Sequence, residues 1–180
     1  ATLEKSPQEL VPVINGTGAI IHTNLGRSVF SKDLFDEISD IATSYTNLEF
    51  SLETGKRGAR LSNVGNLLKT ITGAEEAVIV NNNAAAVLLT LITFAQNKEV
   101  IISRGELVEI GGSFRIPEII TVSGAILKEI GTTNRTRISD FEQAITENTA
   151  VLLKVHTSNY EIKGFTESAT TQDLAALAES

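Results

Sequence analysis

The second half of the sequence alternates short apolar runs with segments of helical periodicity, and this alternation limits the possible folds more than any other feature. Strands are predicted at "EAVIV" (76–80), "EVIIS" (99–103), "AILKEIG" (125–131) and "AVLLKVH" (150–156). Helices are predicted at "NAAAVLLTLITFAQ" (83–96), near Pro117, at "ISDFEQAIT" (138–146) with Ser139 as its cap, and at "TQDLAALAES" (171–180). Short strands separated by helices predict an α/β fold of three layers, a mainly parallel sheet with helices on both faces.

The N-terminal part has a different pattern. The first thirty residues contain Pro7, Pro12 and three glycines and predict an irregular arm. Ser31 can cap a helix, because apolar residues follow it at helical spacing. These are Leu34, Phe35, Ile38, Ile41, Ala42 and Tyr45. A further helix is expected from about Asn63 to Thr72, closed by Gly73.

Polar loops follow all four predicted strands. In parallel sheets, ligands gather at the carboxyl ends of the strands. That rule selects Asn81–Asn83, Ser103–Glu106, Gly131–Asn134 and His156–Asn159. The first loop leads from a strand into a helix that opens on three alanines, an arrangement suited to an anion but also to simple helix capping. The common glycine-rich nucleotide motifs are absent from the sequence, so a phosphate-bearing cofactor at such a junction is the favoured ligand.

Composition excludes several classes of function. The sequence has no cysteine, which excludes disulfides, thiolate nucleophiles and cysteine zinc sites. Its formal net charge of −7 does not give the overall positive field expected of a nucleic-acid-binding domain, which leaves only a local basic patch open. No apolar run approaches the ~18 residues of a membrane span, and no signal peptide opens the chain. We therefore expect a cytoplasmic protein without membrane contact.

Six motifs in a fixed order give a more specific indication. They are "HTNLGR", "ETGKRGAR", "VNNNAAAVLL", "SRGELVEIGGSFRIP", "EIGTTNRT" and "KVHTSNYEIKGFT". Together they resemble bacterial selenocysteine synthase, the L-seryl-tRNA(Sec) selenium transferase family, over about residues 11–167. The resemblance implies an aspartate-aminotransferase-like fold and the cofactor pyridoxal 5′-phosphate (PLP). It also implies an arm at 1–30 and, at 31–180, the first half of the PLP-binding large domain of fold type I.

The resemblance implies a reaction as well as a fold. The family converts seryl-tRNA(Sec) to selenocysteinyl-tRNA(Sec) with selenophosphate, and it assembles as a homo-oligomer, a decamer built as a pentamer of dimers. Its Schiff-base lysine lies in a Gly-Asp-Lys motif that these residues do not contain, so we expect that lysine beyond Ser180 and no catalytic residue in this chain. We expect the family's N-terminal tRNA-binding region to be absent or reduced to a stub before Val11. The chain thus resembles an N-terminal part that is inactive alone.

The resemblance also implies candidate binding residues. Asn82, Asn83 and Ala84 open the helix where the PLP phosphate binds, with plain N-capping as the alternative. Arg27, in the arm, is expected to bind an anionic group such as selenophosphate. Arg57 and Arg60 are candidates for the same anion or for tRNA phosphate, because guanidinium suits bidentate phosphate binding. A solvated basic loop explains these two equally well.

The ring of the cofactor is expected beside other loops. Glu106 lies where related enzymes place a residue against the ring, and Arg104 is the alternative occupant. His156 and Asn159 follow the last strand, where relatives place a polar side chain against the phenolic oxygen, although His156 fits a structural role equally. Lys154 is disfavoured as a substitute Schiff-base lysine because it lies within the predicted strand. Residues 132–135 are left out of the site.

Two other functions remain open from the sequence. One is a PLP-dependent elimination or lyase reaction on an amino acid or amino sugar, without tRNA. A tRNA-binding domain upstream in the gene would distinguish the transferase from this lyase. The other is a noncatalytic remnant that only oligomerises or binds a partner, which a reading frame without a lysine-bearing second half would indicate.

Overall fold

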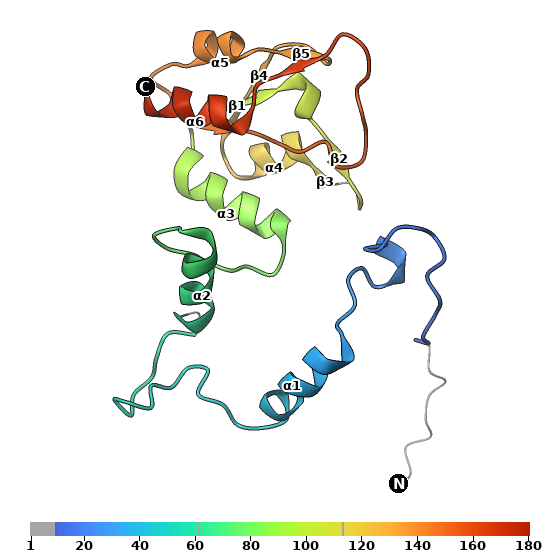
Figure 1. Ribbon diagram of the computed structural model, residues 1–180. Coiled ribbons are helices and arrows are strands. Elements are labelled where there is room, and N and C mark those ends of the chain that lie inside the picture. The colour runs from blue at the N-terminus through green and yellow to red at the C-terminus, as the bar shows by residue number, and fades with distance from the viewer. Residues whose placement is uncertain (1–9, 61, 113) are drawn as a thin grey trace. The chain divides into compact units, whose positions relative to one another are not determined.

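The computed structural model describes residues 10–60, 62–112 and 114–180, and its internal contacts divide the chain into two units, residues 1–63 and 64–180 (Figure 1). The expected stub of a tRNA-binding region lies almost entirely in residues 1–9, outside the described residues.

The N-terminal unit has little regular structure. A short 3-10 helix, η1 (Thr23–Leu25), is capped by His22, whose Nδ1 accepts the Asn24 N–H at 3.2 Å. Helix α1 (Lys32–Ala42) begins after Ser31, whose Oγ accepts the Leu34 N–H at 3.1 Å, so the predicted cap is confirmed. No residue in the range 10–60 is buried. The apolar stripe of α1 is therefore uncovered within this unit.

The C-terminal unit contains a parallel sheet with strand order β4-β1-β6. Its strands are β1 (Glu99–Ser103), β4 (Ile126–Ile130) and β6 (Thr149–Leu153). Successive side chains of a strand point to opposite faces. Accordingly, Val100 and Ile102 join one buried cluster and Ile101 joins another. The predicted sheet with helices on both faces is confirmed.

Two helices pack on each face of this sheet. Helices α3 (Asn83–Ala95) and α4 (Ile116–Val122) supply Leu91, Ala95, Ile116 and Ile120 to the first cluster. Helices α5 (Ile138–Ala144) and α6 (Thr171–Glu179) supply Phe141 and Leu174 to the second. Helix α2 (Ser62–Thr72) is followed by Gly73, whose φ of 74° is the left-handed conformation expected there.

Two small ladders extend from the strand ends. The 3-10 turn η2 (Arg104–Glu106) follows β1 and leads to an antiparallel hairpin of β2 (Glu109–Ile110) and β3 (Phe114–Arg115). Strand β5 (Arg135–Thr136) pairs in parallel with β7 (Glu167–Ser168). Neither ladder was expected from the sequence, because two-residue strands carry no periodic signal.

Three local predictions were wrong. The run 76–80 is not a strand: no described segment pairs with it, and Val78 and Ile79 are exposed. Helix α5 begins at Ile138, so Ser139 lies inside it; the Asp140 carboxylate accepts the Arg137 N–H at 2.7 Å and starts the helix earlier. Strand β6 ends at Leu153, so Lys154 lies just past the strand and not within it.

Candidate functional site

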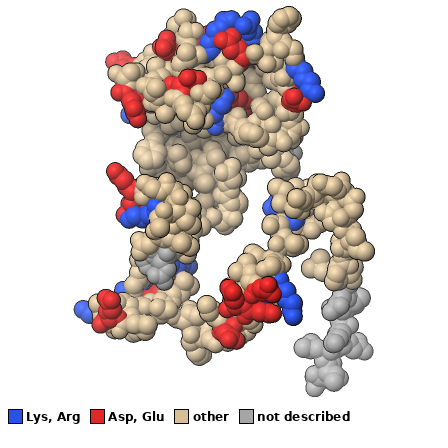
Figure 2. Space-filling model, in the orientation of Figure 1, with Lys and Arg blue, Asp and Glu red and all other residues tan. Residues whose placement is uncertain are grey.

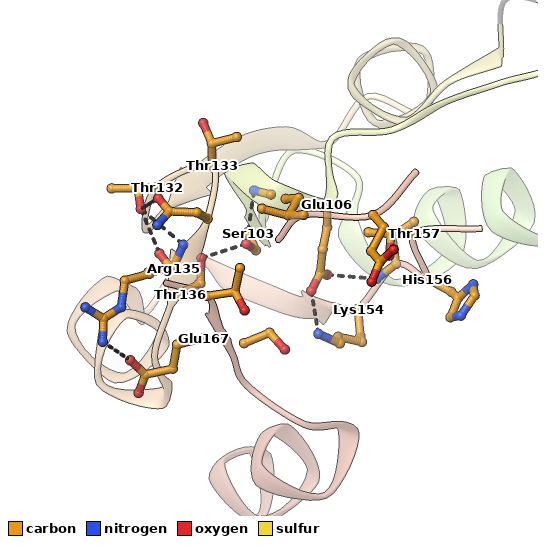
Figure 3. A pocket seen from close by; sticks show the side chains of 17 residues that line it. Ser103, Glu106, Thr132, Thr133, Arg135, Thr136, Lys154, His156, Thr157 and Glu167 are labelled. Atoms are coloured by element: carbon orange, nitrogen blue, oxygen red, sulfur yellow. Dashed lines mark hydrogen bonds and ion pairs between the residues drawn. The ribbon is translucent and has the colours of Figure 1, made fainter. Parts of the chain in front are cut away.

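A polar cavity of about 420 Å³ lies where β1, β4 and β6 end (Figure 3). Three of the four strand-end loops selected from the sequence contribute to its lining. The lining comprises Ser103, Gly105 and Glu106, residues 132–136, residues 154–157, and five residues between 161 and 168. The fourth loop, Asn81–Asn83, does not line it. Glu106 and His156 are thus the sequence-predicted site residues that the cavity brings together.

The Glu106 carboxylate binds the segment that follows β6 and is shielded from solvent. Its side chain is 7% exposed, and its Oε1 accepts from Lys154 Nζ at 2.5 Å. Its Oε2 accepts the Val155 N–H at 2.9 Å. Both oxygens are thereby occupied by a segment 48 residues and more along the chain. Figure 3 shows Glu106 pointing toward Lys154, while the His156 ring points away from the pair.

The segment after β6 makes two further contacts with the segment after β1. Asn159 Nδ2 donates to the Glu109 carbonyl at 2.9 Å, and the Tyr160 hydroxyl donates to the Gly105 carbonyl. Burial and the nearby negative charge of Glu106 raise the pKa of the Tyr160 hydroxyl above its ordinary value. The Asn159 amide is therefore engaged with backbone, and it does not line the cavity.

The floor of the cavity is held by hydroxyl groups and close backbone approaches. Ser103 Oγ and Thr136 Oγ1 lie 2.7 Å apart and are buried. A Cβ at Gly131 would come within 2.2 Å of Thr136 Oγ1, and Gly131 has a φ of +64°. A Cβ at Gly105 would come within 2.6 Å of the Thr133 carbonyl oxygen. Both positions therefore require glycine. The absence of a side chain there allows the segment after β1 and the end of β4 to lie close to residues 133–136.

A second group of charged residues, two arginines and one glutamate, lies at the opposite side of the cavity. Arg135 Nη2 donates to Glu167 Oε2 at 2.9 Å, and Arg137 Nε approaches the same oxygen at 3.0 Å. These guanidinium groups hold the pKa of the Glu167 carboxyl below its ordinary value. The Glu167 carboxylate is therefore neutralised by two guanidinium groups. Figure 2 shows a similar mixture of both signs on the visible face of residues 64–180.

The start of α3 has the donor set of an anion site. Asn82 is the N-cap, and its Oδ1 accepts the Ala85 N–H at 2.8 Å. The amide N–H groups of Asn83 and Ala84, in the first turn, find no acceptor among the described residues, as is usual at a helix start. The capping interpretation is thus correct for Asn82 and leaves two donors available.

Arg27 lies in the N-terminal unit with an unpaired charge. It follows Gly26, and both residues adopt positive φ, 84° and 63°. A non-glycine residue rarely adopts this conformation. The Arg27 N–H donates to the His22 carbonyl at 3.1 Å, but its guanidinium has no acceptor within the described part of the chain.

Arg57 and Arg60 share one carboxylate. Arg57 Nη2 lies 2.9 Å from Glu49 Oε2, and Arg60 Nε donates to Glu49 Oε1 at 2.5 Å. The two arginine side chains are 82% and 68% exposed, whereas that of Glu49 is 28% exposed. A tight loop holds the pair, since the Gly58 N–H donates to the Glu49 carbonyl at 2.8 Å. The sequence did not indicate this partner for the two arginines.

Other candidates have structural partners. Arg104, the alternative ring-side residue, donates to the Gly131 carbonyl and lies 3.4 Å from Glu129. Over the described ranges, no group of three or more histidine, aspartate or glutamate side chains could hold a metal ion. No helix within the same ranges is long and apolar enough to cross a membrane.

Comparison with known proteins identifies close relatives. Residues 13–180 match the family described as L-seryl-tRNA selenium transferase. The L-seryl-tRNA(Sec) selenium transferase of Wolinella succinogenes is 59% identical over 170 residues, which cover 94% of this chain and 38% of that protein. The protein of the same name from Clostridium perfringens (strain 13 / Type A) is 56% identical and covers 98% of this chain. That from Aquifex aeolicus is 59% identical over 92% of this chain. The chain spans 36–38% of the length of these relatives.

A solved structure shares the fold. The structure of D-glucosaminate-6-phosphate ammonia-lyase superposes with a TM-score of 0.66 at 22% identity, covering 87% of this chain and 43% of that one. At this identity the likeness concerns the fold alone. It agrees with the fold class expected from the sequence.

Proposed function

Since this chain belongs to the L-seryl-tRNA selenium transferase family, we propose that the protein containing it converts seryl-tRNA(Sec) to selenocysteinyl-tRNA(Sec) with PLP and selenophosphate. The observation that carries this proposal is the 56–59% identity to transferases of that name over more than nine-tenths of the chain. We place the Schiff-base lysine outside these 180 residues, which then act as the binding part of the site.

The start of α3 fits the phosphate of PLP. Two free amide N–H groups, those of Asn83 and Ala84, point along a 13-residue helix whose dipole favours an anion. Alanine in the first turn leaves room for close approach to the backbone, and Asn82 keeps the turn capped. When bound, PLP supplies an electron sink that permits loss of the serine hydroxyl. The protein's part is to hold the cofactor and orient the substrate.

We place the ring-side residues after β1 and β6. Glu106, His156 and Asn159 come from these two loops, which the structure joins by hydrogen bonds. The exposed His156 ring is free to turn toward a ligand. Lys154 is excluded from this set as a nucleophile, because its ammonium group is paired with Glu106.

Arg27 is proposed to bind selenophosphate. Its guanidinium has no partner among the described residues, and its positive φ shows that the chain holds it in a rarely adopted conformation. A guanidinium offers two parallel charge-assisted hydrogen bonds to an oxyanion. Arg57 and Arg60 are proposed as a secondary contact for tRNA phosphate or the same anion, since the donors not used by Glu49 face solvent.

The assembly and location follow from family membership as proposals. We propose a cytoplasmic homo-oligomer, a decamer, that takes seryl-tRNA(Sec) partly through regions outside this chain. Within it, residues 1–30 would form the arm and residues 31–180 part of the PLP-binding domain. The uncovered apolar side chains of α1 support association, because exposed apolar patches mark interaction sites.

The test uses Arg27→Lys in the whole enzyme. Lysine keeps the charge but loses the paired hydrogen bonds, so selenium transfer should fall at least about tenfold. The amount of bound PLP should stay unchanged, because the phosphate is assigned to α3. Lys32→Arg, on the same unit and 89% exposed, is the control and should leave both quantities unchanged. Loss of the cofactor, or unaltered selenophosphate saturation and turnover, would refute the role of Arg27.

A second candidate is a PLP-dependent elimination or lyase reaction on an amino acid or amino sugar. We retain this candidate because the chain shares its fold with D-glucosaminate-6-phosphate ammonia-lyase. Release of ammonia from such a substrate without tRNA would support this candidate, and strict dependence on seryl-tRNA would exclude it. A noncatalytic oligomerising remnant would show neither activity.

A further inference from the structure

Glu106 is the only buried charged residue in the part of the chain that the structure describes, at 6% relative exposure. A carboxylate is removed from water at a large cost unless a partner charge and hydrogen bonds compensate. Lys154 supplies the charge at 2.5 Å and the Val155 N–H supplies a hydrogen bond at 2.9 Å. These compensating groups lie 48 and 49 residues further along the sequence, after helices α4 and α5 and strand β6.

These contacts belong to a larger seam between two loops. We call residues 104–109 the β1-end loop and residues 154–160 the β6-end loop. Four hydrogen bonds join them, two through Glu106, one from Asn159 to the Glu109 carbonyl, and one from Tyr160 to the Gly105 carbonyl. Three of the four end on backbone atoms, so they fix the path of the chain and not only the side chains.

The β6-end loop depends on this seam. The ladder of β6 ends at Leu153, so the backbone after it has no strand neighbour. Within the loop, the structure shows one backbone hydrogen bond, from the Ser158 N–H to the His156 carbonyl at 3.0 Å. The loop carries both ring-side candidates of β6, His156 and Asn159. Its position is therefore set largely from the β1 side.

We propose that Glu106 is a positioning residue: its carboxylate clamps the β6-end loop to the β1-end loop, with Lys154 as its counter-ion, and so holds His156 and Asn159 at the site. Glu106, proposed above to lie beside the cofactor ring, acts on the cofactor mainly through this loop, because both of its carboxylate oxygens already bind the loop. Lys154 is the counter-ion of this clamp, and its paired ammonium group does not act as a nucleophile. The consequence for catalysis rests on the proposed function, but the clamp itself does not.

The clamp has a signature that does not require cofactor. Burial and the charge of Glu106 both raise the pKa of Tyr160. The sequence contains two tyrosines, so in a Tyr45→Phe background Tyr160 alone gives the tyrosinate absorbance. In that background Glu106→Gln should lower the titration midpoint of Tyr160 toward its ordinary value. The midpoint should remain above that value, because burial remains.

Amide hydrogen exchange reports the clamp directly. In the 180-residue chain, Glu106→Gln should speed exchange at the Val155 N–H by about tenfold or more, as expected when a hydrogen bond to a charged acceptor is weakened. Lys154→Met should speed it as well, by leaving the carboxylate without its counter-ion. Glu109→Gln is the matched control, since this carboxylate is half-exposed and binds Arg115 instead. It should change neither the exchange nor the Tyr160 titration.

The functional arm uses the whole enzyme. Glu106→Gln and Lys154→Met should each weaken PLP affinity, and the double variant should lose less than the sum of the two, because both remove one clamp. If the wild-type enzyme transfers no selenium, the proposed function fails while the exchange and titration still judge the clamp. Unchanged Val155 exchange in Glu106→Gln, or a loosened loop with undiminished PLP affinity, would overturn the positioning role. So would PLP captured on Lys154 by borohydride.

Discussion

The two units of this chain use the same kind of sequence pattern with different results. Helix α1 has a clear apolar stripe, yet no residue from 10 to 60 is buried. Helix α3 is apolar around most of its surface, and it buries Leu91 and Ala95 against the sheet. The pattern predicts that a helix forms in both cases. What covers the stripe depends on neighbours that the pattern does not specify.

The comparison also separates two kinds of candidate residue. In residues 64–180, Glu106 and Asn159 are held by hydrogen bonds from distant segments. Among residues 10–60 of the N-terminal unit, the Arg27 side chain has no partner, and Arg57 pairs with Glu49, eight residues away. The C-terminal unit thus holds its candidate binding residues in place by its own hydrogen bonds. The arginines of the N-terminal unit are held by few contacts within that unit. Figure 2 shows the acidic side chains of α1 grouped together, in contrast to the mixed charges of the other unit.

The largest expected contrast is in hydrogen exchange of the isolated chain. Amides in β1 should exchange at least about a thousandfold more slowly than those in α1, because folding equilibrium constants of small domains begin near that value. Exchange measured by mass spectrometry on peptides from 99–103 and 32–42 would show it. Comparable protection of the two segments would mean that the apolar face of α1 is covered, which would contradict the difference between the two units.

A substitution pair in the two units should show the next largest difference. Phe141 is 1% exposed in the second cluster, whereas Phe35 is 59% exposed on α1. Phe141→Ala should lower the free energy of unfolding by about 3–5 kcal/mol, the usual cost of removing a buried aromatic ring. Phe35→Ala should change it by no more than about 0.5 kcal/mol. Urea denaturation of both variants tests this, and equal losses would place Phe35 in a core.

Much of the C-terminal unit could be predicted because its signals are local. Apolar runs at 99–103 and 125–131 and the cap at Asn82 each sit within a few residues of the element they specify. The rule that ligand sites gather at strand ends brought three predicted loops to one cavity. The roles of the individual residues there remain predictions.

The failures come from interactions at long range. The run 76–80 has a strand's composition, but a strand also needs a neighbour, and no described segment provides one. The end of β6 was misplaced because its ladder stops opposite Ile102, near the end of β1, and Lys154 beyond it binds Glu106, 48 residues earlier. The Glu49 partner of Arg57 and Arg60 was missed for a related reason: side-chain pairing across a loop leaves no periodic trace.

A glycine pair gives a smaller test. Gly131 and Gly55 both have positive φ, but a Cβ would meet Thr136 at 2.2 Å in the first case and open space in the second. Gly131→Ala should therefore cost about 1–3 kcal/mol more than Gly55→Ala, the usual penalty for overpacking. Thermal unfolding of the two variants measures the difference. If the costs are equal, the close approach of β4 and β5 is not maintained in solution.

The smallest expected effect concerns acid. Glu99, at the start of β1, accepts from Lys128 Nζ at 2.9 Å and from the hydroxyls of Thr146 and Thr149. The Lys128 hydrogen bond is the largest cause, and with the hydroxyls it holds the pKa of Glu99 below its ordinary value. In the unfolded chain this carboxyl takes up its proton at a higher pH than in the folded chain. Its contribution to stability is therefore present above about pH 4.3, the ordinary glutamate value, and is lost as the pH falls through the folded pKa.

Glu99→Gln removes this contribution from the C-terminal unit. The variant should be less stable than the parent at about pH 7, and the two should converge at a pH below the lowered pKa of folded Glu99, where the parent carboxyl is also protonated. Asp36→Asn is the control from α1, where the carboxylate lies 3.9 Å from Lys32 on an exposed surface. It should leave the acid profile of the C-terminal unit unchanged, because α1 contributes no buried residue. Urea unfolding at several pH values, followed by far-ultraviolet circular dichroism, provides the measurement. A constant gap between Glu99→Gln and the parent across that range would show that Glu99 stabilises β1 by packing and not by its charge.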